Sequence, residues 1–202
     1  MRLLSRAYRD MNDLKNFANE VACKIKELLE EKARVTVAID GRCASGKTTL
    51  AREISRMLKA PVVHADHFFL RPKQRTPERL AEAGGNLDRE RLLSEVLIPR
   101  VQGEAISYTR FDCSTQALVE KINIPKNPVL IVEGSYSMHP ELSGFYDLKI
   151  FLTTKKSTQE ERLLAREGAG KLVLFQERWI PLEEAYFEEL RPSERCDIIF
   201  EN

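Results

Sequence analysis

Residues 35–48 read Val-Thr-Val-Ala-Ile-Asp-Gly-Arg-Cys-Ala-Ser-Gly-Lys-Thr, and this stretch decides the fold. Its first five residues are rich in β-branched side chains and predict a buried strand. Gly41 to Thr48 fits the pattern G-x-x-x-x-G-K-[ST], and residues 48–58 predict a helix. Glycines let several backbone N–H groups of such a loop converge on a phosphate, and the helix N-terminus adds favourable charge. The stretch therefore predicts a strand, a phosphate-binding loop and a helix.

The loop predicts a site for a nucleoside triphosphate with Mg²⁺. Lys47 can reach the β- and γ-phosphates, and the hydroxyl of Thr48 can ligate Mg²⁺. Glu133 follows the strongest predicted strand, residues 129–132, and could serve the metal directly or through water, because ligands bind at the carboxyl ends of such strands. The alternative is an acid that faces solvent. The expected nucleotide-binding residues are Gly41, Arg42, Cys43, Ala44, Ser45, Gly46, Lys47, Thr48 and Thr49.

Further strands and helices are predicted to alternate along the chain. The predicted strands cover residues 61–65, 148–152 and 198–200, and the predicted helices cover residues 14–29, 89–97, 158–166 and 182–190. Residues 71–88 are charged and contain prolines and glycines, which indicates an irregular insertion with a short helix near residues 77–83. This alternation predicts an α/β fold with a parallel sheet covered on both faces, formed by residues 1–202 as one domain.

Composition limits the classes of partner. The chain has 32 lysines and arginines and 31 acids, a formal charge of +1, which provides no overall field for nucleic acid or an anionic membrane. Four cysteines without a C-x-x-C pair argue against a disulfide framework or a zinc site. The longest aliphatic run has four residues, too few to span a bilayer. We therefore expect a cytoplasmic protein with a small-molecule partner, with a homo-oligomer left open.

The order of the motifs resembles that of the uridine kinase-like family of P-loop kinases. The likeness runs from about residue 35 to residue 200 and includes the loop, Asp66-His67-Phe68-Phe69, Asn86-Leu87-Asp88, Val132-Glu133-Gly134 and a later helix with arginines. The resemblance implies a three-layer P-loop sandwich with a five-stranded parallel sheet in the order 2-3-1-4-5 and a lid at about residues 158–180. It also implies ATP or GTP as donor and a hydroxyl acceptor such as a nucleoside.

The resemblance also implies roles for single residues. The family's general base matches Asp66, its metal-serving glutamate matches Glu133, and the aspartate that touches the acceptor's sugar matches Asp88. Asp66 has the alternative of a helix N-cap, for which aspartate is favoured. The family's lid arginines match a helix that contains Arg162 and Arg166, which lie one turn apart. These two arginines either clamp the transferring phosphoryl group or lie on a solvated face.

The acceptor pocket has fewer candidates. Phe68 and Tyr108 could form its aromatic wall, although core packing explains most aromatic residues equally well. Arg110 could bind a polar acceptor or could be an exposed loop charge. We therefore expect a kinase that acts on a hydroxyl of a small metabolite, a nucleoside or related compound first. The alternatives are a kinase for another alcohol, such as a vitamin precursor, and a regulatory P-loop protein with weak hydrolysis.

Overall fold

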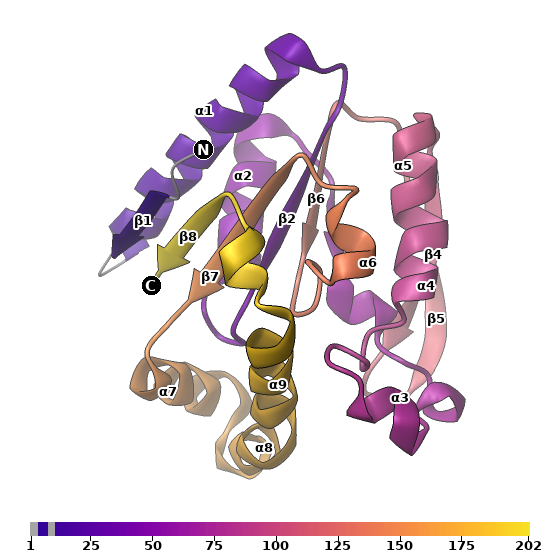
Figure 1. The fold of residues 1–202 in the computed structure, drawn as a ribbon, viewed down its shortest axis with the longest axis vertical. Coiled ribbons are helices and arrows are strands. Elements are labelled where there is room, and N and C mark those ends of the chain that lie inside the picture. Colours follow the sequence, from indigo (N-terminus) through magenta and orange to yellow (C-terminus); the bar gives the residue numbers. More distant parts are fainter. Residues whose placement is uncertain (1–3, 8–10) are drawn as a thin grey trace.

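The computed structural model describes residues 4–7 and 11–202 and contains a central sheet of parallel strands (Figure 1). The spatial order of the strands is β1-β8-β7-β2-β6-β3. All neighbouring pairs run parallel. The strands are β1 (Leu4–Ala7), β2 (Val35–Gly41), β3 (Val62–His64), β6 (Val129–Glu133), β7 (Leu148–Thr153) and β8 (Ile198–Glu201).

The five predicted strands occur in the predicted order, since β3-β6-β2-β7-β8 is the order 2-3-1-4-5. Every residue of β2 and β6 is buried, as expected of central strands covered on both faces. The structure adds β1 as a sixth strand, which pairs with β8 at the edge. Its sequence, Leu-Ser-Arg-Ala, is too short and too polar to predict a strand.

Helices cover both faces of the sheet, which confirms the three-layer sandwich (Figure 1). α1 and α2 cover one face and enclose a core with Ile25, Leu50 and Ile131. The other face packs against residues of α4, α6 and α9 and of the π-helical turn Leu93–Leu97, around Leu92, Val132 and Tyr186. The helices are α1 (Met11–Glu31), α2 (Lys47–Leu58), α3 (Pro77–Ala81), α4 (Arg89–Leu92), α5 (Ile98–Gln102), α6 (Pro140–Ser143), α7 (Lys156–Glu167), α8 (Ala169–Leu174) and α9 (Ile180–Leu190).

An antiparallel hairpin of β4 (Ile106–Asp112) and β5 (Ala117–Ile124) was not predicted. Most of β5 is exposed, so its sequence lacks the apolar alternation of a half-buried strand. β4 packs beside the short turn Ala65–Phe68, where the rings of Phe68 and Tyr108 lie 4.9 Å apart. The hairpin thus forms a wall next to the carboxyl end of β3.

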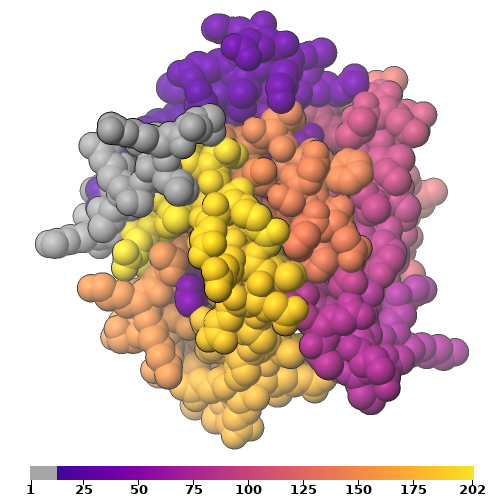
Figure 2. Space-filling view, viewed as in Figure 1, coloured from indigo at the N-terminus to yellow at the C-terminus, as the bar shows by residue number. Residues whose placement is uncertain are grey.

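The predicted lid segment, residues 158–180, is helical in α7, in α8 and in the π-helical turn Phe175–Trp179 that leads into α9. These helices lie beyond the carboxyl ends of the strands (Figure 1). On the face drawn in Figure 2, the C-terminal third of the chain, coloured orange to yellow, forms the centre of the visible surface. No helix within residues 4–7 and 11–202 has the length and apolar character to cross a membrane.

Candidate nucleotide and acceptor site

The loop between β2 and α2 has the backbone that the motif predicts. Gly41 has a φ of 134°, and a Cβ there would lie 1.8 Å from the carbonyl oxygen of Leu152. Gly46 has a φ of 100°, a conformation that side chains rarely adopt. These two positions therefore require glycine, and they let the loop turn sharply before α2 begins at Lys47.

Lys47 lies against the same loop. Its side chain is largely buried, and its Nζ donates hydrogen bonds to the carbonyl oxygens of Gly41, at 2.7 Å, and Arg42, at 2.8 Å. The ammonium is therefore held across the loop by backbone oxygens rather than by a carboxylate. Because no acid neutralises it within the described residues, its charge is available to an anion in the loop.

Thr48 and Glu133 come together next to the loop, as predicted for a magnesium site. The Thr48 hydroxyl lies 3.2 and 3.3 Å from the two carboxylate oxygens of Glu133, which is 4% exposed. Such hard oxygen donors suit Mg²⁺. Among the described residues no cluster of three or more His, Cys, Asp or Glu could hold a metal. Two protein oxygen donors fit Mg²⁺ when phosphate oxygens or waters supply its remaining ligands, as is usual for this ion.

His64, at the end of β3, fixes the orientation of Glu133. Its Nδ1 lies 2.5 Å from Oε1 of Glu133. This hydrogen bond raises the pKa of His64. Sequence reasoning gave His64 no role beyond the core, because the pairing of β3 with β6, which brings His64 beside Glu133, is not visible in a local pattern.

Asp66 lies in the turn that follows β3, and its carboxyl faces the cavity next to the loop. It makes no hydrogen bond with a residue that the structure describes, so the structure does not support the alternative of a helix N-cap. The residue is exposed to the cavity, although protein atoms around the carboxyl displace part of its hydration. This desolvation raises the pKa of Asp66, and the charge of Glu133 acts in the same direction.

One cavity of about 1150 Å³ joins these groups. Its walls include Asp66, Glu133 and both predicted lid arginines, Arg162 and Arg166. Gly41, Arg42 and Ser45 lie outside its wall, whereas the other predicted nucleotide-binding residues line it: Cys43, Ala44, Gly46, Lys47, Thr48 and Thr49. The volume suits two substrates side by side, since single ligands usually occupy roughly 300–1,000 Å³.

The two lid arginines differ in their contacts. Arg162 is half-buried and donates to the carbonyl oxygen of Ala44, at 3.2 Å, and to Oδ1 of Asn202, at 3.3 Å. Arg166 is exposed and forms an ion pair with Glu167 at 2.9 Å. Arg162 thus contacts the phosphate loop itself. Arg166 instead forms a surface ion pair, as expected if it lies on a solvated face.

Four predicted acceptor residues lie outside the cavity wall, so their placement does not support contact with an acceptor. Phe68 and Tyr108 are core residues, and the Tyr108 hydroxyl lies 3.1 Å from Nδ1 of His67. Asp88 is 1% exposed and caps α4 by accepting from the backbone N–H of Arg91. Arg110 pairs with Asp112 at 3.1 Å. Local packing and capping explain all four.

The sequence is similar to those of two kinases. It is 25% identical over 127 residues to uridine-cytidine kinase C of Dictyostelium discoideum, a match that covers 59% of this chain and 27% of that protein. It is 27% identical over 141 residues to cytidylate kinase of Pyrobaculum calidifontis, covering 67% of this chain and 62% of that one. The chain thus spans less than two thirds of either relative. No protein-family model matches it.

The fold has a solved counterpart. A structure described as a possible uridine kinase from Bacillus stearothermophilus superposes with a TM-score of 0.65 at 20% identity, covering 90% of this chain and 99% of that one. The chain has the fold of that structure, and its sequence similarity to a uridine-cytidine kinase agrees with a resemblance to the uridine kinase-like P-loop kinases. The predicted resemblance is therefore confirmed, and the phosphate-binding loop is hereafter called the P-loop.

The P-loop of this kinase fold is braced by α9, a contact that the sequence did not predict. Glu183 is 5% exposed and accepts hydrogen bonds from the backbone N–H of Cys43, at 2.9 Å, and from the hydroxyl of Ser135, at 2.5 Å. Glu184 pairs with Arg42 at 2.6 Å. A run of acids on a helix normally indicates a solvated face, so only the fold reveals these partners.

Asp40, directly before the P-loop, forms the buried centre of this brace. Its carboxylate is fully buried and accepts hydrogen bonds from the N–H groups of Gly41, Tyr136 and Met138 and from the hydroxyl of Tyr186 on α9. Burial raises the pKa of Asp40 to about 6, although these hydrogen bonds act in the opposite direction. The carboxylate thereby connects β2, the turn after β6 and α9.

We expect Tyr186→Phe to destabilise the protein. The hydroxyl of Tyr186 donates to Asp40 at 2.7 Å, and removal of a hydrogen bond to a buried charged group costs roughly 1.5–3 kcal/mol. Tyr146→Phe is the matched control, because the buried hydroxyl of Tyr146 has no partner in the described part of the chain. Urea unfolding should show a lower free energy for Tyr186→Phe and an equal or higher one for Tyr146→Phe. Equal losses in both variants would contradict the bracing role.

Proposed function

We propose that this protein is an ATP-dependent kinase that transfers a phosphoryl group to a hydroxyl of a small metabolite, with a nucleoside or a related compound as the first candidate. One observation carries the proposal: the P-loop and the carboxyl of Asp66, which is exposed and has no hydrogen-bond partner among the described residues, face the same cavity. A nucleotide switch needs no such carboxyl facing a second pocket. The two similar kinases, which act on pyrimidine nucleosides or nucleotides by their names, support a related acceptor.

The phosphate end of the cavity belongs to the P-loop. Backbone N–H groups of the loop and the N-terminus of α2 would hold the phosphates of ATP or GTP, with Lys47 as the charged contact. Thr48 and Glu133 would hold Mg²⁺, and His64 would keep Glu133 in position. The nucleotide supplies the phosphoryl group, and the metal neutralises charge on the phosphates. Arg162, anchored to Ala44, would add positive charge from the lid side.

At the other end, Asp66 would act on the acceptor. Its carboxylate accepts the proton of the acceptor hydroxyl while the acceptor oxygen bonds to the γ-phosphorus. The bond from that phosphorus to the bridging oxygen of the nucleotide breaks, and ADP leaves. The raised pKa of Asp66 suits this task, because it makes the carboxylate a stronger base than an ordinary aspartate.

A screen for acceptors tests the proposal. ADP release from ATP is measured with a panel of nucleosides, nucleotides and other small alcohols, and also without acceptor. We expect at least one acceptor to raise ADP release well above the background hydrolysis. A protein that binds ATP but shows the same release with every acceptor would be a nucleotide-binding regulator, and the kinase proposal would be wrong.

The pH dependence should also reflect Asp66. Its pKa is raised, so the carboxylate form needed for proton acceptance is lost at a higher pH than for an exposed aspartate as the solution is acidified. We therefore expect kcat/KM to fall on the acid side with an apparent pKa above 3.8, the ordinary value. A profile of kcat/KM against pH, over the range in which the protein stays folded, checks this. Activity that stays constant down to the ordinary pKa of aspartate would argue against this base.

A further inference from the structure

Arg75 lines the cavity that the P-loop and Asp66 also line. It is half-buried, between the short turn Pro72–Gln74 and α3. Its Nε donates to the carbonyl oxygen of Leu70 at 3.0 Å, and its guanidinium lies 5.9 Å from the ring centroid of Phe111. These contacts fix the stem of the side chain and leave the two terminal NH₂ groups without a hydrogen-bond partner among the described residues.

Two other half-buried arginines of this region, Arg79 and Arg91, form ion pairs, whereas Arg75 does not. Arg79 pairs with Glu90 at 2.8 Å, and Arg91 pairs with Glu95 at 2.8 Å. Arg75 has no carboxylate within ion-pair distance in the described part of the chain. Burial lowers the pKa of Arg75, and the charge of Arg178 acts in the same direction. A half-buried cation without a counter-ion is energetically unfavourable, and a bound anion would relieve this.

Asp66 and Arg75 line one cavity, together with Lys47 of the P-loop and Cys113 of the β4–β5 turn. The charges of Asp66 and Arg75 both act on the Cys113 thiol: burial raises its pKa, Asp66 acts in the same direction, and Arg75 opposes both. An acceptor with its hydroxyl at Asp66 can therefore have another group at Arg75 within the same cavity.

A second feature of the cavity wall also suits a polar ligand. Asn86 is 6% exposed and lines the cavity, and its side-chain amide makes no hydrogen bond to another described residue. Buried polar groups are nearly always hydrogen-bonded, so this unpaired amide at the wall suits a ligand with complementary groups.

We propose that the acceptor carries an anionic group, a phosphate or a carboxylate, which Arg75 binds while Asp66 faces the reacting hydroxyl. This inference rests on the proposed function and specifies its substrate class. Arg75 would bind the anion through its terminal NH₂ groups, a geometry that suits both oxyanions. The acceptor is thus a hydroxyl compound with a negative charge at its far end.

Matched acceptors test this in turnover. In each pair one member has an anionic group where the other has a hydroxyl: uridine 3′-monophosphate and uridine, ribose 5-phosphate and ribose, and pantothenate and pantothenyl alcohol. We expect the anionic members to have the higher kcat/KM. Arg75→Gln should raise their KM roughly 10- to 100-fold and leave the neutral members unchanged, since hydrogen bonds to charged groups contribute about that much. Phosphate and carboxylate members, compared with each other, identify which anion the site prefers.

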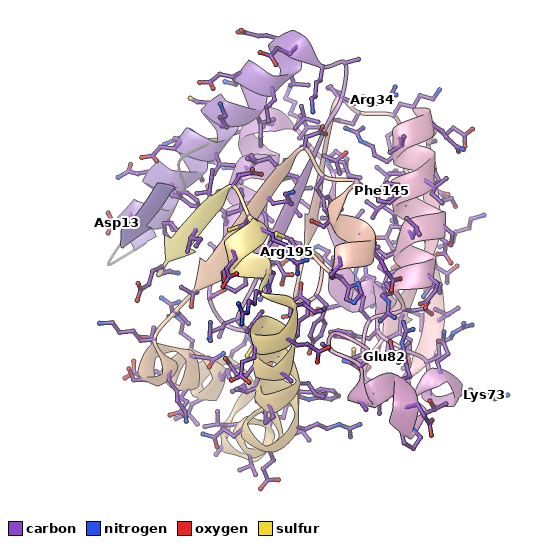
Figure 3. The ribbon with its side chains drawn as sticks, viewed as in Figure 1. Asp13, Arg34, Lys73, Glu82, Phe145 and Arg195 are labelled. Atoms are coloured by element: carbon purple, nitrogen blue, oxygen red, sulfur yellow. The ribbon has the colours of Figure 1, made fainter. Side chains whose placement is uncertain are left out.

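Lys73→Gln is the matched control. Lys73 lies two residues before Arg75 and points away from the body of the protein (Figure 3). Its substitution removes the same charge from the same segment without changing the cavity wall. Arg75→Lys should give a KM between those of the wild type and Arg75→Gln, because lysine keeps the charge but lacks the forked guanidinium. The proposal would be overturned if the wild type had the same kcat/KM for neutral and anionic acceptors. It would also be overturned if Arg75→Gln and Lys73→Gln raised the KM of the anionic acceptors equally.

A binding experiment separates this inference from the proposed function. Trp179 is the chain's single tryptophan and lines the cavity, so its fluorescence reports binding there. With the P-loop saturated by a magnesium complex of a non-hydrolysable ATP analogue, ribose 5-phosphate and pantothenate are titrated. We expect saturable binding in the wild type and Lys73→Gln and at least tenfold weaker binding in Arg75→Gln. Such binding without turnover would contradict the kinase proposal only, whereas equal or absent binding in all three proteins would overturn the anion site.

Discussion

Lys47→Ala should lower the rate of phosphoryl transfer by about 100- to 1,000-fold, the usual cost of losing one such electrostatic contact. Lys47 is held across the P-loop by the carbonyl oxygens of Gly41 and Arg42, at the place where the phosphates would bind. Whatever the function of a nucleotide bound in this loop, the Lys47 ammonium is expected to contact its phosphates. Steady-state ADP release with saturating acceptor measures the loss.

Lys24→Ala is the control for this variant. Lys24 lies on the exposed face of α1 and pairs with Glu27 at 2.8 Å, so its removal changes the net charge equally without touching the P-loop. We expect Lys24→Ala to keep wild-type turnover, and circular dichroism should show both variants folded. Turnover of Lys47→Ala within a few fold of the wild type would show that the loop does not bind the reacting phosphates.

The sequence predicted the centre of the fold because its signals there are local. Residues 35–39 and 129–132 are continuous apolar runs, and such runs become the central strands of a parallel sheet. The P-loop was predicted for the same reason, since its glycines, Lys47 and Thr48 are adjacent in the chain. Carboxyl ends of parallel strands share one edge, so Asp66 and Glu133 could also be expected near each other.

The features that the sequence missed depend on distant partners. Glu183 meets Cys43 across 140 residues, and Tyr186 meets Asp40 across 146. No periodicity within α9 distinguishes these side chains from a solvated acidic face. The structure gives two of the predicted acceptor residues local roles that the sequence did not indicate: Asp88 caps a helix and Tyr108 packs in the core. Arg75 was overlooked because only the fold shows that its neighbours are paired and it is not.

Asp66→Asn should lower phosphoryl transfer by about a hundred- to ten-thousandfold, the usual contribution of a general base. The substitution keeps the size of the side chain and removes the basic oxygen. Since the carboxyl of Asp66 hydrogen-bonds to no described residue, its replacement should leave the stability nearly unchanged. The rigid strand β3 before it and the buried Phe68 after it should hold the backbone in place.

Lower stability or weaker ATP binding in Asp66→Asn would also slow phosphoryl transfer, and each can be measured separately. If Asp66 were structural, Asp66→Asn would lower the free energy of unfolding, so urea unfolding must accompany the kinetics. If Asp66 mainly affected the nucleotide, its replacement would change the affinity for ATP, because Asp66 lies within electrostatic reach of Lys47 and Glu133. We expect neither change to exceed a few fold in affinity or about 1 kcal/mol in stability.

A single-turnover experiment with γ-labelled ATP tests the central claim, that the P-loop and Asp66 serve two substrates in one cavity. Excess enzyme is mixed with labelled ATP, Mg²⁺ and the acceptor found in the screen, and the label on the acceptor is followed by rapid quenching. We predict fast transfer to the acceptor in the wild type, and at least a hundredfold slower transfer in Asp66→Asn with normal ATP binding. Transfer in Asp66→Asn at the wild-type rate, or label released only as free phosphate by the wild type, would contradict this claim.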